Sequence, residues 1–107
     1  MTTAHDVLGK AIESIEKRGW TRGMMYDYDS GTACALGHIG LALIDLHVTG
    51  EEAKTLHDQA ERLLLRQVTD PHDPFCGSIP FFNDGKGRTK EDVVLAFKHA
   101  MEAAANE

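Results

Sequence analysis

The chain has 107 residues, a length that fits one domain with its own hydrophobic core. Its 17 acidic and 11 basic side chains give a formal net charge of −6, and the basic residues are scattered along the sequence. Nucleic-acid binding needs the opposite balance, so we expect no direct contact with DNA or RNA. Hydrophobic residues make up 42%, as in soluble globular proteins, and the longest apolar run is too short to span a bilayer.

The first residues show no charged stretch followed by an apolar one, so we expect no secretory leader and a cytoplasmic location. In that reducing compartment the two cysteines, Cys34 and Cys76, are expected to be free thiols. Both thiols are therefore candidates for chemistry as well as for packing.

Three segments carry the pattern of an amphipathic helix that begins with a capping box. In each, a threonine precedes a carboxylate by three positions, so that the two side chains can bond the free amides of the first turn. The pairs are Thr3 with Asp6, Thr49 with Glu52, and Thr89 with Asp92. Apolar residues at helical spacing follow each pair, and they predict one buried stripe per helix.

Residues 32–46 predict a fourth helix that is apolar on nearly all sides. Such a helix is normally buried, so we expect it at the centre of the domain, with Gly37 and Gly40 allowing a close neighbour. Residues 24–34 contain a turn signal and fit either a short β-hairpin or an irregular loop. The predicted fold is a single, mostly α domain over residues 1–107, with four helices in a compact arrangement.

Cys34 and His38 stand four residues apart, on one face of the expected central helix. His72 and Cys76 repeat this spacing in reverse order, within a long loop predicted for residues 69–86. Two thiolates and two imidazoles could form a tetrahedral zinc site, although the spacing matches no C-x-x-C signature. A small structural zinc domain is therefore an alternative to plain burial of Cys34 as an apolar residue.

Cys34 is also a candidate nucleophile, because the first turn of a helix stabilises a thiolate. His38 or His72 would then serve as the base, and Asn83 or Asp84 would orient the imidazole. A cysteine-dependent hydrolase centred on Cys34 is accordingly a second alternative.

Asn83 and Asp84 are, in the first place, residues that favour turns. We favour a structural role, in which Asp84 caps the start of the central helix. In that arrangement Ile79, Phe81 and Phe82 would close the open end of the helix bundle.

The densest group of aromatic and methionine side chains consists of Trp20, Met24, Met25, Tyr26 and Tyr28. Such residues are usually part of a core, but where they are exposed they anchor protein interfaces. The candidate partner-binding residues are therefore Trp20, Met24, Tyr26 and Tyr28, together with Arg88, which can pair with an acidic group.

A resemblance rests on these runs: Arg18-Gly19-Trp20-Thr21, Cys34-Ala35-Leu36-Gly37, Ile79-Pro80, Phe82-Asn83-Asp84 and Gly87-Arg88-Thr89. In order and spacing they resemble a family of small proteins of unknown function from actinobacteria and their phages. That family usually has tryptophan at the position of Phe82. Its stretch around His72 and Cys76 is variable, which weakens the zinc alternative.

The resemblance implies no reaction and no cofactor. It implies a phage or actinobacterial setting, in which small acidic proteins often bind a host protein. The expected function is thus a non-enzymatic protein-binding or regulatory module, with a host protein as the candidate partner and no contact with nucleic acid or membrane.

Overall fold

The computed structural model describes residues 1–68 and 78–106. In these ranges the chain forms five helices: α1 (Ala4–Arg18), α2 (Ala35–Asp45), α3 (Gly50–Val68), α4 (Ile79–Asn83) and α5 (Lys90–Ala105). The described residues contain no sheet, because Trp20 and Tyr26 each form only an isolated bridge to Ala33. The mostly α architecture is confirmed, and of the two alternatives for residues 24–34 the structure shows the irregular loop and not the β-hairpin.

In the connection between α1 and α2, backbone pairing is limited to two isolated bridges that meet at Ala33. The amide of Thr21 donates to the carbonyl of Ala33 at 3.0 Å, and the amide of Ala33 donates to that of Gly19 at 3.3 Å. The next amide, that of Cys34, donates instead to the carbonyl of Met25 at 3.1 Å. This bond and the bond from the amide of Asp27 to the carbonyl of Thr32 at 2.9 Å close the single antiparallel bridge of Tyr26 with Ala33, and no second bridge extends it into a ladder in the described structure.

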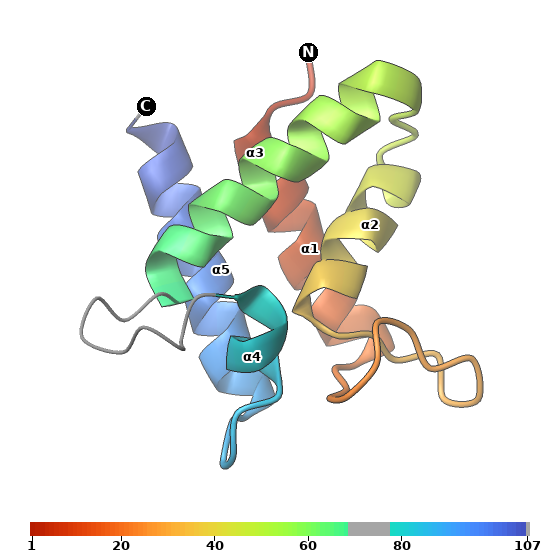
Figure 1. The fold of residues 1–107 in the computed structure, drawn as a ribbon. Helices are drawn as coiled ribbons and strands as arrows, with labels where there is room; N and C mark the ends of the chain where they lie inside the picture. The colour runs from red at the N-terminus through yellow and green to blue at the C-terminus, as the bar shows by residue number, and fades with distance from the viewer. Residues whose placement is uncertain (69–77, 107) are drawn as a thin grey trace.

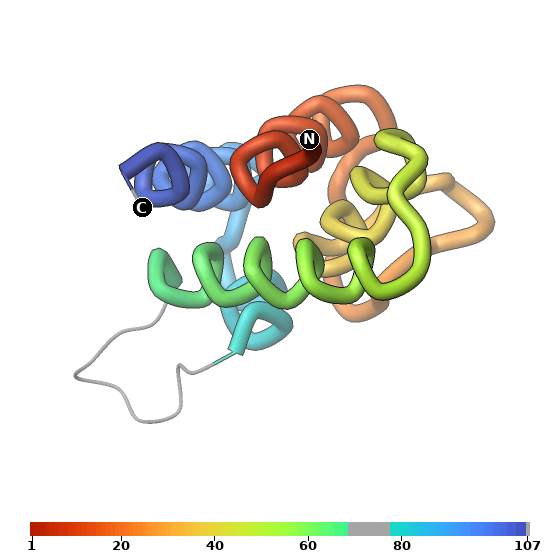
Figure 2. Tube along the Cα trace, turned by 90° about the horizontal axis from the view of Figure 1, so that it is seen from above, coloured from red at the N-terminus to blue at the C-terminus, as the bar shows by residue number. Residues whose placement is uncertain are grey.

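The central helix is α1, which packs against α2, α3 and α5. Figure 2 shows α1 and α5 on one side of the molecule and α3 on the other, with α2 between α1 and α3 at one end. The radius of gyration, 13.0 Å, is that of a compact domain of about 100 residues. Within the described ranges no helix combines the length and hydrophobicity needed to cross a membrane.

The prediction that the apolar helix is buried on all sides is wrong. Ala35, Ile39 and Ala42 of α2 are fully buried, but Ile44 is 67% exposed. Leu36, Gly40 and Leu41 on the same outer side are only partly buried. The apolar residues of α2 thus serve two faces, one against the core and one that no described helix covers (Figure 1).

Local signals place three helix starts correctly, because α1, α3 and α5 each begin directly after the predicted threonine. The capping boxes of Thr3 with Asp6 and of Thr89 with Asp92 both form. At Thr49 no such box forms in the described structure, although α3 begins at the next residue, Gly50, whose φ is +66°.

The helices enclose one apolar core. Its largest fully buried apolar side chains are Phe97, Leu8, Ile15, Ile39, Leu64, Val7 and Val93.

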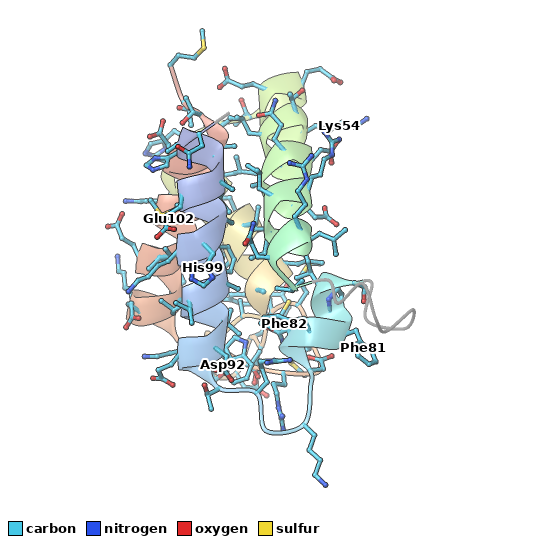
Figure 3. All side chains as sticks on the ribbon, turned by 90° about the vertical axis from the view of Figure 1, so that its left-hand side faces the viewer. Lys54, Phe81, Phe82, Asp92, His99 and Glu102 are labelled. Carbon is cyan, nitrogen blue, oxygen red and sulfur yellow. The ribbon has the colours of Figure 1, made fainter. Side chains whose placement is uncertain are left out.

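The short helix α4 closes one end of this core against α2 and α3 (Figure 1). Ser78 caps it by accepting a hydrogen bond from the amide of Phe81 at 3.1 Å. Ile79 is 2% exposed, and Phe82 packs partly buried against the core. Phe81 is 52% exposed and points away from the helices (Figure 3), so only two of the three residues expected to close the bundle do so.

Candidate functional site

The side chain of Asn83 joins α4 to the connection between α1 and α2. It is completely buried, and its Oδ1 accepts hydrogen bonds from the indole N–H of Trp20 at 2.6 Å and from the amide of Ala35 at 2.9 Å. Its Nδ2 donates to the carbonyl of Thr21 at 3.0 Å. Because Ala35 is the first residue of α2, Asn83 helps to cap that helix from a distant part of the chain.

Asp84 holds the other side of this junction. Its Oδ1 accepts hydrogen bonds from Nδ2 of Asn83 at 3.0 Å and from the amide of Gly23 at 2.9 Å. These two bonds lower the pKa of Asp84 below its ordinary value. Arg22 adds a bond from its guanidinium to the carbonyl of Gly85 at 2.9 Å. The prediction that Asp84 caps α2 is therefore wrong, since Asn83 does so and Asp84 binds the preceding connection.

Arg88 is committed to α4. Its Nε donates to the carbonyl of Phe82 at 2.8 Å, and its guanidinium carbon lies 4.0 Å from the centroid of the Phe82 ring. A cation above an aromatic face is attracted by the ring electrons. The structure thus places Arg88, like Trp20, in the junction between segments, although both were considered as partner-binding residues.

His38 lies at the centre of a buried polar chain between α1 and α2. Its Nε2 is 2.8 Å from the carbonyl oxygen of Gly19, and its Nδ1 is 2.8 Å from Oγ of Ser14. A carbonyl only accepts, so Nε2 carries the proton and Nδ1 accepts from the serine hydroxyl. Arg18 donates to the same hydroxyl oxygen at 2.7 Å and to both carboxylate oxygens of Asp45 at 2.8 Å.

The surroundings of His38 favour its neutral form. Burial is the main cause of its lowered pKa, and the positive charge of Arg18 adds to the effect. The hydrogen bond to Gly19 acts in the opposite direction and only partly offsets burial. Arg18 likewise lowers the pKa of Asp45, mainly through their side-chain hydrogen bonds. The chain from Asp45 to Gly19 is thus a satisfied structural network.

Cys34 is a buried free thiol that caps α2. It is 8% exposed, and its Sγ accepts a weak bond from the amide of Gly37 at 3.5 Å. Both ring nitrogens of His38 are bonded to Ser14 and Gly19, so His38 is not placed as a base for this thiol or as a metal ligand beside it.

The other residues proposed for catalysis or zinc binding are not placed as partners of Cys34 in the described structure. Asn83 is occupied by the junction. His72 and Cys76, the second half of the suggested zinc site, lie outside the described residues. Every buried side-chain nitrogen or oxygen in the described structure has a hydrogen-bond partner. No such atom in these residues therefore marks a ligand site by lacking a partner.

A mostly apolar groove lies over the outer side of α2, with a volume of about 420 Å³. Its apolar lining consists of Met25, Tyr26, Tyr28, Leu36, Leu41 and Ile44, and we call it the apolar groove. Gly37 and Gly40 of α2 and His57 of α3 complete its surface. Tyr28 is 90% exposed and Met25 61%, and the rings of Tyr26 and Tyr28 meet edge to face with centroids 4.8 Å apart.

A smaller cavity of about 230 Å³ continues the apolar groove towards α4. It shares Met25 and Leu36 with the groove and is also lined by Met24, Cys34 and Pro80. Met24 is half exposed there. Of the partner-binding residues predicted from sequence, Met24, Tyr26 and Tyr28 therefore lie on one continuous surface.

Sequence reasoning missed the part of the groove that α2 supplies, namely Leu36, Leu41 and Ile44. The available signal was that this helix has more apolar positions than one buried stripe requires. It also missed His57, Asp58 and Glu61 on α3, whose potential ligand atoms lie within 4.8 Å of one another. Exposed acidic groups of this kind are common, and they show no metal site by themselves.

A family model described as "Family of unknown function (DUF6197)" matches residues 1–103. The chain belongs to this family. The membership confirms the predicted relationship to an uncharacterised family, and in this DUF6197 protein the match includes both the Asn83 junction and the apolar groove. No curated protein and no solved structure matches the chain.

Proposed function

We propose that this DUF6197 protein is a non-enzymatic binding module that holds an apolar segment of a partner protein in the apolar groove. The observation that carries this proposal is the exposure of Tyr28, Ile44 and Met25 on one concave surface. Clustered exposed apolar side chains of this kind mark interaction sites, and methionine and tyrosine adapt well to a partner.

The polar groups considered for catalysis give weaker support to an enzyme. The side chains of Asn83 and His38 are already hydrogen-bonded to backbone groups and to neighbouring side chains. His38 is then not available to Cys34 as a base, and Asn83 is not available to orient an imidazole. These hydrogen bonds therefore favour a binding function at the apolar groove over thiol chemistry at Cys34.

The setting of the proposed module follows from the sequence resemblance to proteins of actinobacteria and their phages. In that setting the partner would be a host protein, and the module would act in the host cytoplasm. The net charge of −6 favours a protein partner over a nucleic acid.

Affinity capture from an actinobacterial lysate tests the proposal with matched variants. Ile44→Asp places a carboxylate in the groove, and Leu95→Asp does the same at a half-exposed leucine of α5 outside it. We expect the unaltered protein and Leu95→Asp to retain the same partner, and Ile44→Asp to lose it. An unchanged capture by Ile44→Asp, or no protein retained by any of the three, would overturn the proposal.

A further inference from the structure

The floor of the apolar groove has the form of a short helical stripe. Leu36, Gly40 and Ile44 follow one another every four residues along α2, which corresponds to about 12 Å of helix at about 1.5 Å per residue. A Cβ added at Gly40 would meet no atom within 4 Å, so this position is a shallow notch in the floor. The stripe matches the length of about two turns of an occupant helix.

Two segments that line the groove also carry carboxylates next to their lining residues. Asp27 and Asp29 alternate with Tyr26 and Tyr28 in the connection before α2. The segment that supplies the two tyrosines of the groove therefore also carries two carboxylates.

At the α3 edge, Nδ1 of His57 is 3.5 Å from Oε2 of Glu61, with Asp58 in the same cluster. Lys54, one turn earlier on α3, points away from the helices (Figure 3) and offsets part of this negative charge. The residues named on the two sides of the groove thus comprise four carboxylates and one lysine. The groove has an apolar floor, and the segments beside it are mainly acidic.

These charges select among possible occupants. A second copy of this chain would bring the same acidic margins and a further net charge of −6 against them, which opposes association. A segment with basic residues beside its apolar stripe would meet complementary charge on both edges. Amphipathic helices that lie in apolar grooves use anchors at such helical spacings.

We infer that the apolar groove binds a basic amphipathic segment of a partner protein, about two helical turns long, whose lysines or arginines flank its apolar stripe. The inference rests on the proposed function and adds the chemistry of the partner. Apolar anchors would occupy the floor over Gly40, and the basic side chains would reach Asp27 and Asp29 on one edge and Asp58 and Glu61 on the other.

Two synthetic amphipathic peptides of about 18 residues test this chemistry, one built of leucine and lysine and the other of leucine and glutamate. Titration calorimetry with the full chain at about 0.15 M salt, where surface charges are already partly screened, measures both affinities. We expect the leucine–lysine peptide to bind at least about tenfold more tightly than the leucine–glutamate peptide. Combined Asp27→Asn and Glu61→Gln substitution should weaken its binding by about threefold or more.

Gly40→Leu separates binding in the groove from general attraction between a cationic peptide and an acidic protein. The Cβ of the new side chain would meet no atom within 4 Å, so we expect the fold to remain and binding to fall by about tenfold or more. Binding of the leucine–lysine peptide that survives Gly40→Leu would overturn the inference, as would its failure to bind. Equal affinity of the two peptides, lost in Gly40→Leu, would refute the basic partner while leaving the binding module intact.

Discussion

Oδ1 of Asn83 accepts a hydrogen bond from the backbone amide of Ala35 at 2.9 Å, across 48 positions of the sequence. The bond satisfies one of the amides that a helix leaves open at its start, and the cap comes from α4. The same oxygen also holds the indole of Trp20. One buried amide group therefore fixes three segments relative to one another.

Replacement of Asn83 by alanine should destabilise the protein severely. The indole N–H of Trp20, the amide of Ala35 and the carbonyl of Thr21 would each lose a partner. With about 1–3 kcal/mol for each buried group left unsatisfied, we expect a loss of about 3 kcal/mol or more in urea unfolding. Trp20→Phe removes only one of these bonds and should cost less. A loss under about 1 kcal/mol for Asn83→Ala would contradict the assigned role.

Gly37→Ala and Gly40→Ala should have opposite effects on stability, although both lie on α2. A Cβ at Gly37 would overlap the carbonyl oxygen of Met25, which also accepts the amide of Cys34. We expect a loss of about 2 kcal/mol or more, because backbone must move. At Gly40 the added methyl meets nothing within 4 Å, and alanine should stabilise the helix by about 0.5–1 kcal/mol. Thermal unfolding of both variants measures this contrast, and equal melting temperatures would refute it.

Stability should depend on pH through His38. Its pKa is lowered in the folded state, so as the pH falls below about 6.5 the unfolded chain takes up this proton first. The contribution of His38 is therefore complete above that pH and declines as the pH falls towards the folded-state pKa. The lowered pKa values of Asp45 and Asp84 act in a separate window, since their contribution is lost only as the pH falls below about 4.

His38→Gln isolates this effect, because the two proteins share all their other histidines. Urea unfolding of the two proteins at about pH 7, 6 and 5 should show a steeper decline for the unaltered protein. Parallel declines would mean that His38 takes up its proton as readily in the folded protein as in the unfolded chain.

The thiol of Cys34 should behave as a buried helix cap. In a Cys76→Ser background, a thiol reagent should label Cys34 slowly in the folded protein and quickly after unfolding, because the side chain is 8% exposed. Rapid labelling of the folded protein at mildly acidic pH would instead support an activated thiolate and the hydrolase alternative.

Substitutions at Cys34 test its cap directly. Serine is a preferred cap, so Cys34→Ser should match or exceed the stability of the unaltered protein, whereas Cys34→Ala should lose about 0.5–1 kcal/mol in urea unfolding. Equal stability of the serine and alanine variants would show that the cap contributes nothing.

The zinc alternative needs four ligands, Cys34, His38, His72 and Cys76. The last two lie outside the described ranges. Metal analysis of protein purified without a chelator tests it at full length. About one zinc per chain would support the site, and much less would refute it.

The sequence by itself determined the elements that depend on neighbouring residues. Thr3 with Asp6 and Thr89 with Asp92 start helices because each box is closed by bonds within four residues. The same local pattern also fitted Thr49, where no box forms, and there the glycine that follows has a positive φ.

Only the tertiary structure decided which side of α2 is covered and which residue caps it. An apolar helix shows no polar side from which its exposed face could be read, so the uncovered side at Ile44 depends on where α1 and α3 pack. Asn83 and Asp84 are adjacent and both can cap a helix, and only the approach of α4 to Ala35 selects Asn83. Such contacts join distant positions, and their geometry arises from the packing of whole helices.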